Sequence, residues 1–339
     1  MEDQPNHALS SSEGIDFQEL VDALLDHETP FAPRYLYRLS GLEEPELTAF
    51  KEAWPQADPA RRLALLEDLE ELAETNTLVS YDAVFQVALE DPNPDTRTTA
   101  IRGLWEAEDP RLVTKFADIL QHDDHFQTRA QAAAGLGQFV YLCELSKITD
   151  TRLEMVIEAL LEVYKNDDAV QVRLRALESL GFSSDQRVSP LLEDAYDRGD
   201  EDWLASALLA MGRSCDEQWS PYVMDKLDHS DSHVRREAAR AAGELELAPA
   251  LPALLSLLDD SDDETRMSAA WSLSELGGAD ARNALAILLE VTEDQAEIDL
   301  LEEALDNLAF NQELDTLELF DFSKEDLEDM LPPDEPNKE

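Results

Sequence analysis

One short sequence frame recurs along the middle of this chain, and it constrains the fold more than any other feature. Each copy has Val or Thr followed by Arg, small or apolar residues three and four positions after the Arg, and usually another apolar residue at position seven. Successive anchor positions lie 32, 44, 31, 31 and 31 residues apart. Such a period is typical of stacked supersecondary units. The anchors are Arg97, Arg129, Arg173, Leu204, Arg235 and Arg266.

Both halves of each unit have the residue spacing of amphipathic helices. Apolar residues recur at i, i+3, i+4 and i+7 in the anchor segments and in the segments between them, such as 110–120, 188–196 and 251–260. Turns rich in Asp, Asn and Ser stand directly before the anchor helices, where these residues act as N-caps. One unit cannot bury its own apolar face, so the pattern predicts an all-α fold of about seven stacked helix–turn–helix units.

This pattern resembles HEAT repeats, in particular the short HEAT-like type known from phycobilisome lyases. The resemblance rests on the Asp-rich turn, the Val/Thr-Arg pair, the Ala pair and the Leu-Gly ending, as in "TRAQAAAGLG" from Thr128. It implies a right-handed α-solenoid, with the anchor helices on the concave face and the other helices on the convex face. It also implies a structural role for the five anchor arginines, as donors to a turn Asp of their own or a neighbouring unit.

The repeat frame divides the chain into three predicted parts. Residues 1–77 form an N-terminal helical cap, residues 78–310 form the solenoid, and residues 311–339 form an acidic amphipathic C-terminal segment that is partly disordered. Terminal units of a solenoid need a modified outer face, so we expect helical caps at both ends.

The C-terminal segment supports two interpretations. Leu327, Met330 and Leu331 make one helical face after Ser323, which stands in an N-cap position, and two prolines stop the helix. The segment is either a last capping helix or a docking peptide that enters a groove of this chain or of a partner.

The net charge limits the partners. The chain carries 77 acidic and 26 basic Lys and Arg residues, a formal net charge of −51. Nucleic acid and anionic membranes are disfavoured, because affinity for both depends on Lys and Arg. Basic proteins are the natural electrostatic partners, although solubility or adaptation to high salt also explains the acid excess.

Other compositional signals point to a cytoplasmic monomer. The two cysteines, Cys143 and Cys215, lie in apolar helical patterns and are expected to be reduced and mostly buried. The N-terminus has no secretory signal, and no run of 18 apolar residues predicts a membrane span.

Catalytic and metal-binding signatures are weak. The chain has no G-x-G-x-x-G, P-loop, G-x-S-x-G or H-E-x-x-H motif. The stretch "HDDH" at 122–125 and the histidines flanking "SDS" at 230–232 lie in turns three repeats apart, too far to share one metal. We therefore predict no metal, no cofactor and no catalytic residues, while an accessory enzyme of lyase type stays open by fold similarity alone.

The anchor helices are less acidic than the rest of the chain. Six windows, each from one residue before the anchor to nine after it, contain 10 Arg and 5 acidic residues. With the five anchor arginines set aside, the predicted groove is about neutral, and Arg with aromatic residues is the composition of binding hot spots. The candidate binding residues are Arg102, Trp105, Arg175, Phe182, Arg213, Arg236, Arg240 and Trp271.

Two of these arginines differ in their expected partners. Arg240 has Glu244 four residues ahead, whereas Arg236 has no acid at that spacing. The leading hypothesis is therefore a non-enzymatic scaffold that binds a protein or peptide in its concave groove. An acidic–apolar segment suits such a groove, and the chain's own C-terminal segment is one candidate. The alternative is an acidic surface that binds a basic protein or mimics nucleic acid.

Overall fold

The computed structural model describes residues 14–145 and 150–318. Within these residues the chain is all-helical, with 18 α-helices, three short 3-10 helices and no strand. The fold is the predicted α-solenoid of helical hairpins. The α-helices are α2 (Phe17–Leu25), α3 (Arg34–Arg38), α4 (Glu46–Ala53), α5 (Pro59–Thr75), α6 (Asp82–Ala88), α7 (Pro94–Arg102), α8 (Arg111–His122), α9 (Phe126–Glu144), α10 (Asp150–Asn166), α11 (Val170–Leu180), α12 (Ser189–Asp197), α13 (Glu201–Arg213), α14 (Ser220–Met224), α15 (Ser232–Glu244), α16 (Leu251–Leu257), α17 (Asp263–Leu276), α18 (Ala279–Val291) and α19 (Gln295–Glu318).

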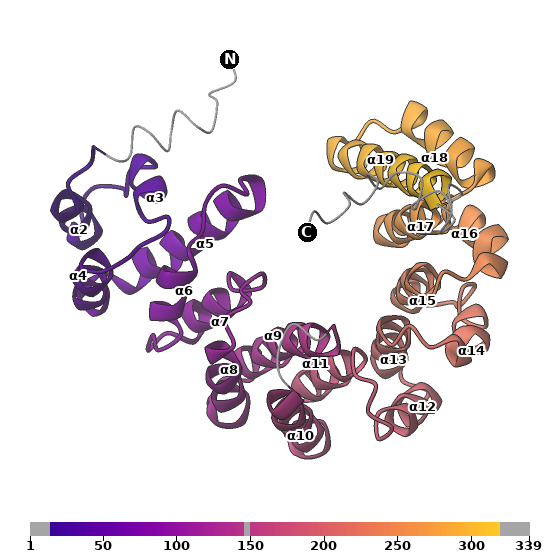
Figure 1. The fold of residues 1–339 in the computed structure, drawn as a ribbon, viewed down its shortest axis with the longest axis horizontal. Helices are drawn as coiled ribbons and strands as arrows, with labels where there is room; N and C mark the ends of the chain where they lie inside the picture. The colour runs from indigo at the N-terminus through magenta and orange to yellow at the C-terminus, as the bar shows by residue number, and fades with distance from the viewer. Residues whose placement is uncertain (1–13, 146–149, 319–339) are drawn as a thin grey trace, which may run out of the picture. The chain divides into compact units, whose positions relative to one another are not determined.

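The chain forms two compact units, one up to Glu193 and one from Asp194. In the first unit α5, α7, α9 and α11 pack in sequence as one layer, and α4, α6, α8 and α10 lie on the other side (Figure 1). In the second unit α13, α15, α17 and α19 form one layer, and α14, α16 and α18 form the other (Figure 1). The predicted part boundaries after residues 77 and 310 stay predictions, and α19 runs across the second of them.

The anchor helices begin where the turn residues cap them. Asn93, Asp200, Asp231 and Asp262 each accept a hydrogen bond from a backbone N–H in the first turn of the following helix. The anchor residue stands four positions after the cap in every one of these helices. This shared geometry places each anchor side chain at the same point of the repeat, next to its own turn.

A ladder of ion pairs links successive repeats through these anchors. Arg97 donates two hydrogen bonds to Asp123 of the next turn, both 2.7 Å long, and another to Asp91 O of its own turn. Arg235 repeats the arrangement with Asp260, again at 2.7 Å, and with His229 O at 2.8 Å. Each such guanidinium therefore ties its own turn to the following one.

The ladder begins one repeat earlier than the sequence pattern indicates. Arg62 of α5 pairs with Asp91 at 2.7 Å, and both side chains are almost completely buried. Trp54 donates its indole N–H to the same carboxylate. Arg62 stands four residues after its N-cap Asp58, as the other anchors do after theirs. The spacing of four residues between cap and anchor marks Arg62 as a further anchor in the sequence, although Leu65 and Leu66 replace the usual small residues.

Two positions replace the Arg–Asp pair with other chemistry. Leu204 takes the Arg position in α13, where it is buried. His229 takes the matching Asp position in the next turn, and its Nδ1 accepts the Asp231 N–H just as Asp260 accepts the Asp262 N–H. Both members of the Arg–Asp pair are therefore replaced together, Arg by Leu204 and Asp by His229. Arg266 uses a third arrangement, with Glu297 of α19 as its acceptor at 2.7 Å.

Close helix packing in the second unit depends on small residues. A Cβ added at Gly243 of α15 would lie 2.6 Å from Ser272 Oγ and 2.8 Å from Ser272 Cα of α17. Ser272 is buried and donates its hydroxyl to Ala239 O, so its polar atom is satisfied inside the helix interface. One cysteine departs from expectation: Cys143 is buried, but Cys215, which lies in a turn after α13, is exposed.

Candidate functional site

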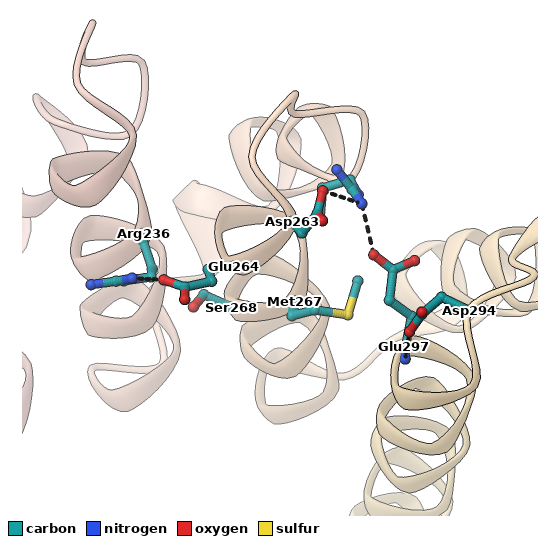
Figure 2. Close-up of a pocket in the computed structure, with 8 residues that line it drawn as sticks. Arg236, Asp263, Glu264, Met267, Ser268, Asp294 and Glu297 are labelled. Atoms are coloured by element: carbon teal, nitrogen blue, oxygen red, sulfur yellow. Dashed lines mark hydrogen bonds and ion pairs between the residues drawn. The ribbon is translucent and has the colours of Figure 1, made fainter.

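Two adjoining hollows lie on the face made by α15, α17 and α19 in the second unit, called here the α15–α17–α19 face. Their volumes are about 680 and 450 Å³, and they share Met267 and Ser268. Figure 2 shows the first hollow, with Arg236 on one helix, Glu264 and Met267 on the next, and Asp294 and Glu297 beyond them. The lining consists of Arg236, Arg240, Glu244, Asp263, Glu264, Arg266, Met267, Ser268, Trp271, Glu275, Asp294, Glu297 and Leu300.

The repeat frame explains which side chains reach this face. Arg236 and Met267 directly follow their anchors, and Arg240 and Trp271 come four residues later. Residues four apart lie above one another on a helix, so each pair forms a short exposed row. Arg236, Arg240 and Trp271 were predicted from the sequence, but Met267 was not, although its position after the anchor is equivalent to that of Arg236.

Trp271 is the largest apolar side chain of the lining. It is 39% exposed and lies in the second hollow with Met267 and Leu300, while Arg240 and Glu244 line the same hollow from α15. Asn307 of α19 donates to Glu275 at 2.7 Å and fixes one carboxylate beside it. A partly exposed indole beside apolar and charged groups is typical of a binding hot spot.

Every arginine of this face already has a carboxylate partner. Arg236 donates to Glu237 at 3.0 Å and also pairs with Glu264 from α17 (Figure 2). Arg240 donates to Glu244 at 3.0 Å, as the sequence spacing predicts. Arg236 has no acid four residues ahead, and its partners are the adjacent Glu237 and an acid of the next repeat, Glu264.

The charge expected of the groove was also wrong for this face. Six carboxylates and three guanidiniums line the two hollows, so the lining is acidic rather than neutral. The sequence windows counted only residues from the anchor onward. They omitted Asp263 and Glu264 in the first turn of α17, where the helix dipole favours acids, and Asp294 and Glu297 from the following unit.

Glu244 has an unusual environment. Burial raises the pKa of its carboxyl above the usual range, although Arg240 and Arg213 nearby act in the opposite direction. The predicted binding residue Arg213 is thus half-buried beside Glu244 rather than part of the hollow lining.

In the first unit, Arg102 and Trp105 share a separate hollow of about 410 Å³. Arg102 donates to Glu70 of α5 at 2.5 Å, and this hydrogen bond raises the pKa of the guanidinium. Trp105 is 60% exposed. The other lining residues are Glu67, Glu71 and Glu74, so this surface is acidic too.

The remaining predicted residues lie apart from both hollows. Arg175 pairs with Glu178 of its own helix at 2.5 Å. Phe182 is half-buried and packs on Tyr141, with ring centroids 5.5 Å apart. The structure therefore does not gather the eight candidates into one site.

No group of three or more His, Cys, Asp or Glu side chains among the described residues has an arrangement that could hold a metal ion. In the "HDDH" turn, Asp123 is occupied by Arg97, which leaves it out of a metal site. None of the helices in the described ranges combines the length and apolar character that a membrane crossing would need.

Comparison with known families agrees with the repeat geometry. The family model for HEAT repeats matches residues 81–150, 200–273 and 220–309, together more than half of the chain. The chain is a HEAT-repeat protein. The matched ranges contain four of the five anchor arginines, and Arg173 lies outside them. No curated protein matches this HEAT-repeat sequence.

Three solved structures with similar folds are distant in sequence from this HEAT-repeat protein. The YibA protein of Escherichia coli is 19% identical over 70% of this chain and 96% of its own, with a TM-score of 0.40. The CpcE–CpcF complex of phycocyanin lyase from Nostoc sp. PCC7120 is 20% identical over 67% and 94%, with a TM-score of 0.47. Human deoxyhypusine hydroxylase in complex with glycerol is 15% identical over 91% and 100%, with a TM-score of 0.36. At these values none of the three bears on what this chain does.

Proposed function

We propose that this HEAT-repeat protein is a non-enzymatic scaffold that binds a basic segment of a protein partner on the α15–α17–α19 face. The observation that carries the proposal is the combination of Trp271, exposed between apolar neighbours, with a surplus of lining carboxylates. Glu275 accepts a hydrogen bond from Asn307 and Asp294 accepts two from the first turn of α19, and both carboxylates keep acceptor capacity for a Lys or Arg of the partner. This unites the two sequence-based hypotheses, a groove with hot spots and an acidic surface.

The lining chemistry favours binding over catalysis. Its described side chains include neither His nor Cys, and the carboxylates of Glu264, Glu244 and Glu297 are held in ion pairs. The same negative charge disfavours the chain's own acidic C-terminal segment as occupant of this face, because like charges at an interface oppose association.

The test uses a pair of labelled peptides that differ only in charge, one with Lys at alternate positions between apolar residues and one with Glu at the same positions. Fluorescence anisotropy with the full chain should show binding of the Lys peptide, weakening as salt rises. Trp271→Ala should weaken that binding about tenfold or more, the scale of a hot-spot truncation. Trp105→Ala, which removes the exposed tryptophan of the other unit, is the matched control and should leave it unchanged.

Either of two results would overturn the proposal. One is tighter binding of the Glu peptide than of the Lys peptide. The other is equal affinity of the wild type and the Trp271→Ala protein, because the indole then contributes nothing and binding is only a diffuse charge effect.

A further inference from the structure

An apolar stripe on α18 lies uncovered at the end of the second unit. Ala284, Ile287, Leu288 and Val291 follow the i, i+3, i+4, i+7 spacing and so lie on one side of the helix. Ile287 is 64% exposed and Val291 is 70% exposed, the highest values among the large apolar side chains of the described residues. Nothing about the binding face proposed above requires this stripe.

The side of α18 next to the stripe accounts for its packing in the unit, and Ala284 and Leu288 at the boundary are half-buried. Ala281 and Leu285 are fully buried there, against the neighbouring helices α16, α17 and α19. In a stack of hairpins the free side of a helix in the last unit is the side that a following unit would cover. Within the described residues no helix follows α19, so the stripe has no partner there.

We propose that the stripe is a docking surface for residues 319–339 of the same chain. These residues begin directly after α19 and contain Leu319, Phe320, Phe322 and the face of Leu327, Met330 and Leu331. No other segment is held so close, since its attachment to α19 gives it a high effective concentration at this end of the unit.

The lengths of the two helices fit this path. α19 has 24 residues and α18 has 13, and they pack as a hairpin joined by residues 292–294. At 1.5 Å per residue, α19 extends about 16 Å past the first residue of α18. Five extended residues span about 17 Å, so residues 319–323 suffice to return the chain to the start of α18. The apolar face that follows then runs alongside the stripe.

Charge supports the stripe over the α15–α17–α19 face. Residues 319–339 contain eight acidic residues and two lysines, and they would meet carboxylates on that face. On α18 the four stripe side chains are uncharged, and Asp280, one turn earlier on the same side, is a single carboxylate against the six on that face. Acids between Leu327 and Leu331 can remain in water while the apolar face is buried.

Lys324 provides a direct assay on the full chain, because Lys324 and Lys338 are the only trypsin sites after Arg282. Docking should protect the bond after Lys324, and a free peptide of residues 319–339 serves as the reference for cleavage of the undocked segment. Ile287→Asp should speed cleavage after Lys324 about tenfold, because cleavage follows the population of the open segment. Leu78→Asp, the same kind of change at a 58% exposed side chain of the first unit, is the matched control and should leave the cleavage rate unchanged.

Equal cleavage after Lys324 in the wild type and the Ile287→Asp protein would overturn the proposal. So would a full-length dimer, measured by light scattering, that Ile287→Asp converts to a monomer, since the occupant would then be a second copy. A chain ending at Glu318 gives an independent measurement. It should bind an apolar fluorescent dye several-fold more than the full chain, and equal dye binding would also contradict the proposal.

Discussion

Replacing Arg235 by Leu tests whether the ion-pair ladder holds successive repeats together. Arg235 donates two hydrogen bonds to Asp260 at 2.7 Å and two more to backbone carbonyls of its own turn, at 2.8 and 3.1 Å. The variant Arg235→Leu removes all four. It leaves Asp260, whose side chain is 8% exposed, still accepting the Asp262 N–H but without its guanidinium.

The expected cost follows from this geometry. Breaking a buried ion pair by removing one partner costs about 3–5 kcal/mol. Arg235 is 14% exposed, so water reaches part of the site, and we expect the lower end of that range, about 3 kcal/mol. Urea unfolding followed by circular dichroism measures the change in the free energy of unfolding. Hydrogen exchange should show the loss concentrated in α15 and α17, because solenoid repeats contact only their neighbours.

The chain supplies its own control. Leu204 and His229 occupy the Arg and Asp positions one repeat earlier. The double variant Arg235→Leu/Asp260→His copies that arrangement and leaves no buried carboxylate without its guanidinium. We expect it to regain most of the loss and to unfold within about 1 kcal/mol of the wild type at pH 8.

Two outcomes would refute this reasoning. One is a loss below about 0.5 kcal/mol in Arg235→Leu, the scale of an exposed ion pair. The other is a double variant that is no more stable than the single one, because the cost would then not come from the abandoned carboxylate.

Three further predictions concern other parts of the second unit and the cysteines. Hydrogen bonds from Arg235 lower the pKa of the Asp260 carboxyl. The stability that they give is complete above the pKa of Asp260 in the unfolded chain, and it is lost as the pH falls through the pKa of Asp260 in the folded protein. Acid titration of unfolding should therefore be flatter in Asp260→Asn. Gly243→Ala should cost about 1–3 kcal/mol in urea unfolding, because the new methyl overlaps Ser272. A thiol reagent should label Cys215 before Cys143 in the native protein, and the Cys215 labelling rate should rise at a higher pH in the native protein than in the unfolded chain, because partial burial raises the pKa of the Cys215 thiol.

The sequence was sufficient to predict the all-helical repeat fold because its signals are local. The cap, the anchor four residues later and the apolar spacing all lie within one helix, and they recur often enough to outweigh exceptions such as Leu204. The exposed positions of Arg240 and Trp271 follow from the same frame. Arg62 shows the limit, since larger residues in α5 obscured a repeat that its cap spacing still marked.

The partners of the exposed arginines could not be read in the same way. Arg236 meets Glu264 of α17, and Arg102 meets Glu70 of α5. These acids are 28 and 32 residues away along the chain, so no spacing rule for one helix identifies them. The charge of a solenoid face is a property of adjacent repeats, and summing charges within single helices predicts a neutral surface where the lining is acidic.

The matched exchange of Arg–Asp for Leu–His also has a consequence for how such a chain can change length. Residues 231–261 contain both a donor, Arg235, and its acceptor, Asp260. A tandem duplication of this 31-residue module would keep every donor next to an acceptor. A duplication with other boundaries could place Leu204 before a turn that has Asp at the position of His229. That arrangement would bury a carboxylate with no counter-charge. The ladder of Arg–Asp pairs therefore limits which repeats can be duplicated or recombined without burying an unpaired carboxylate.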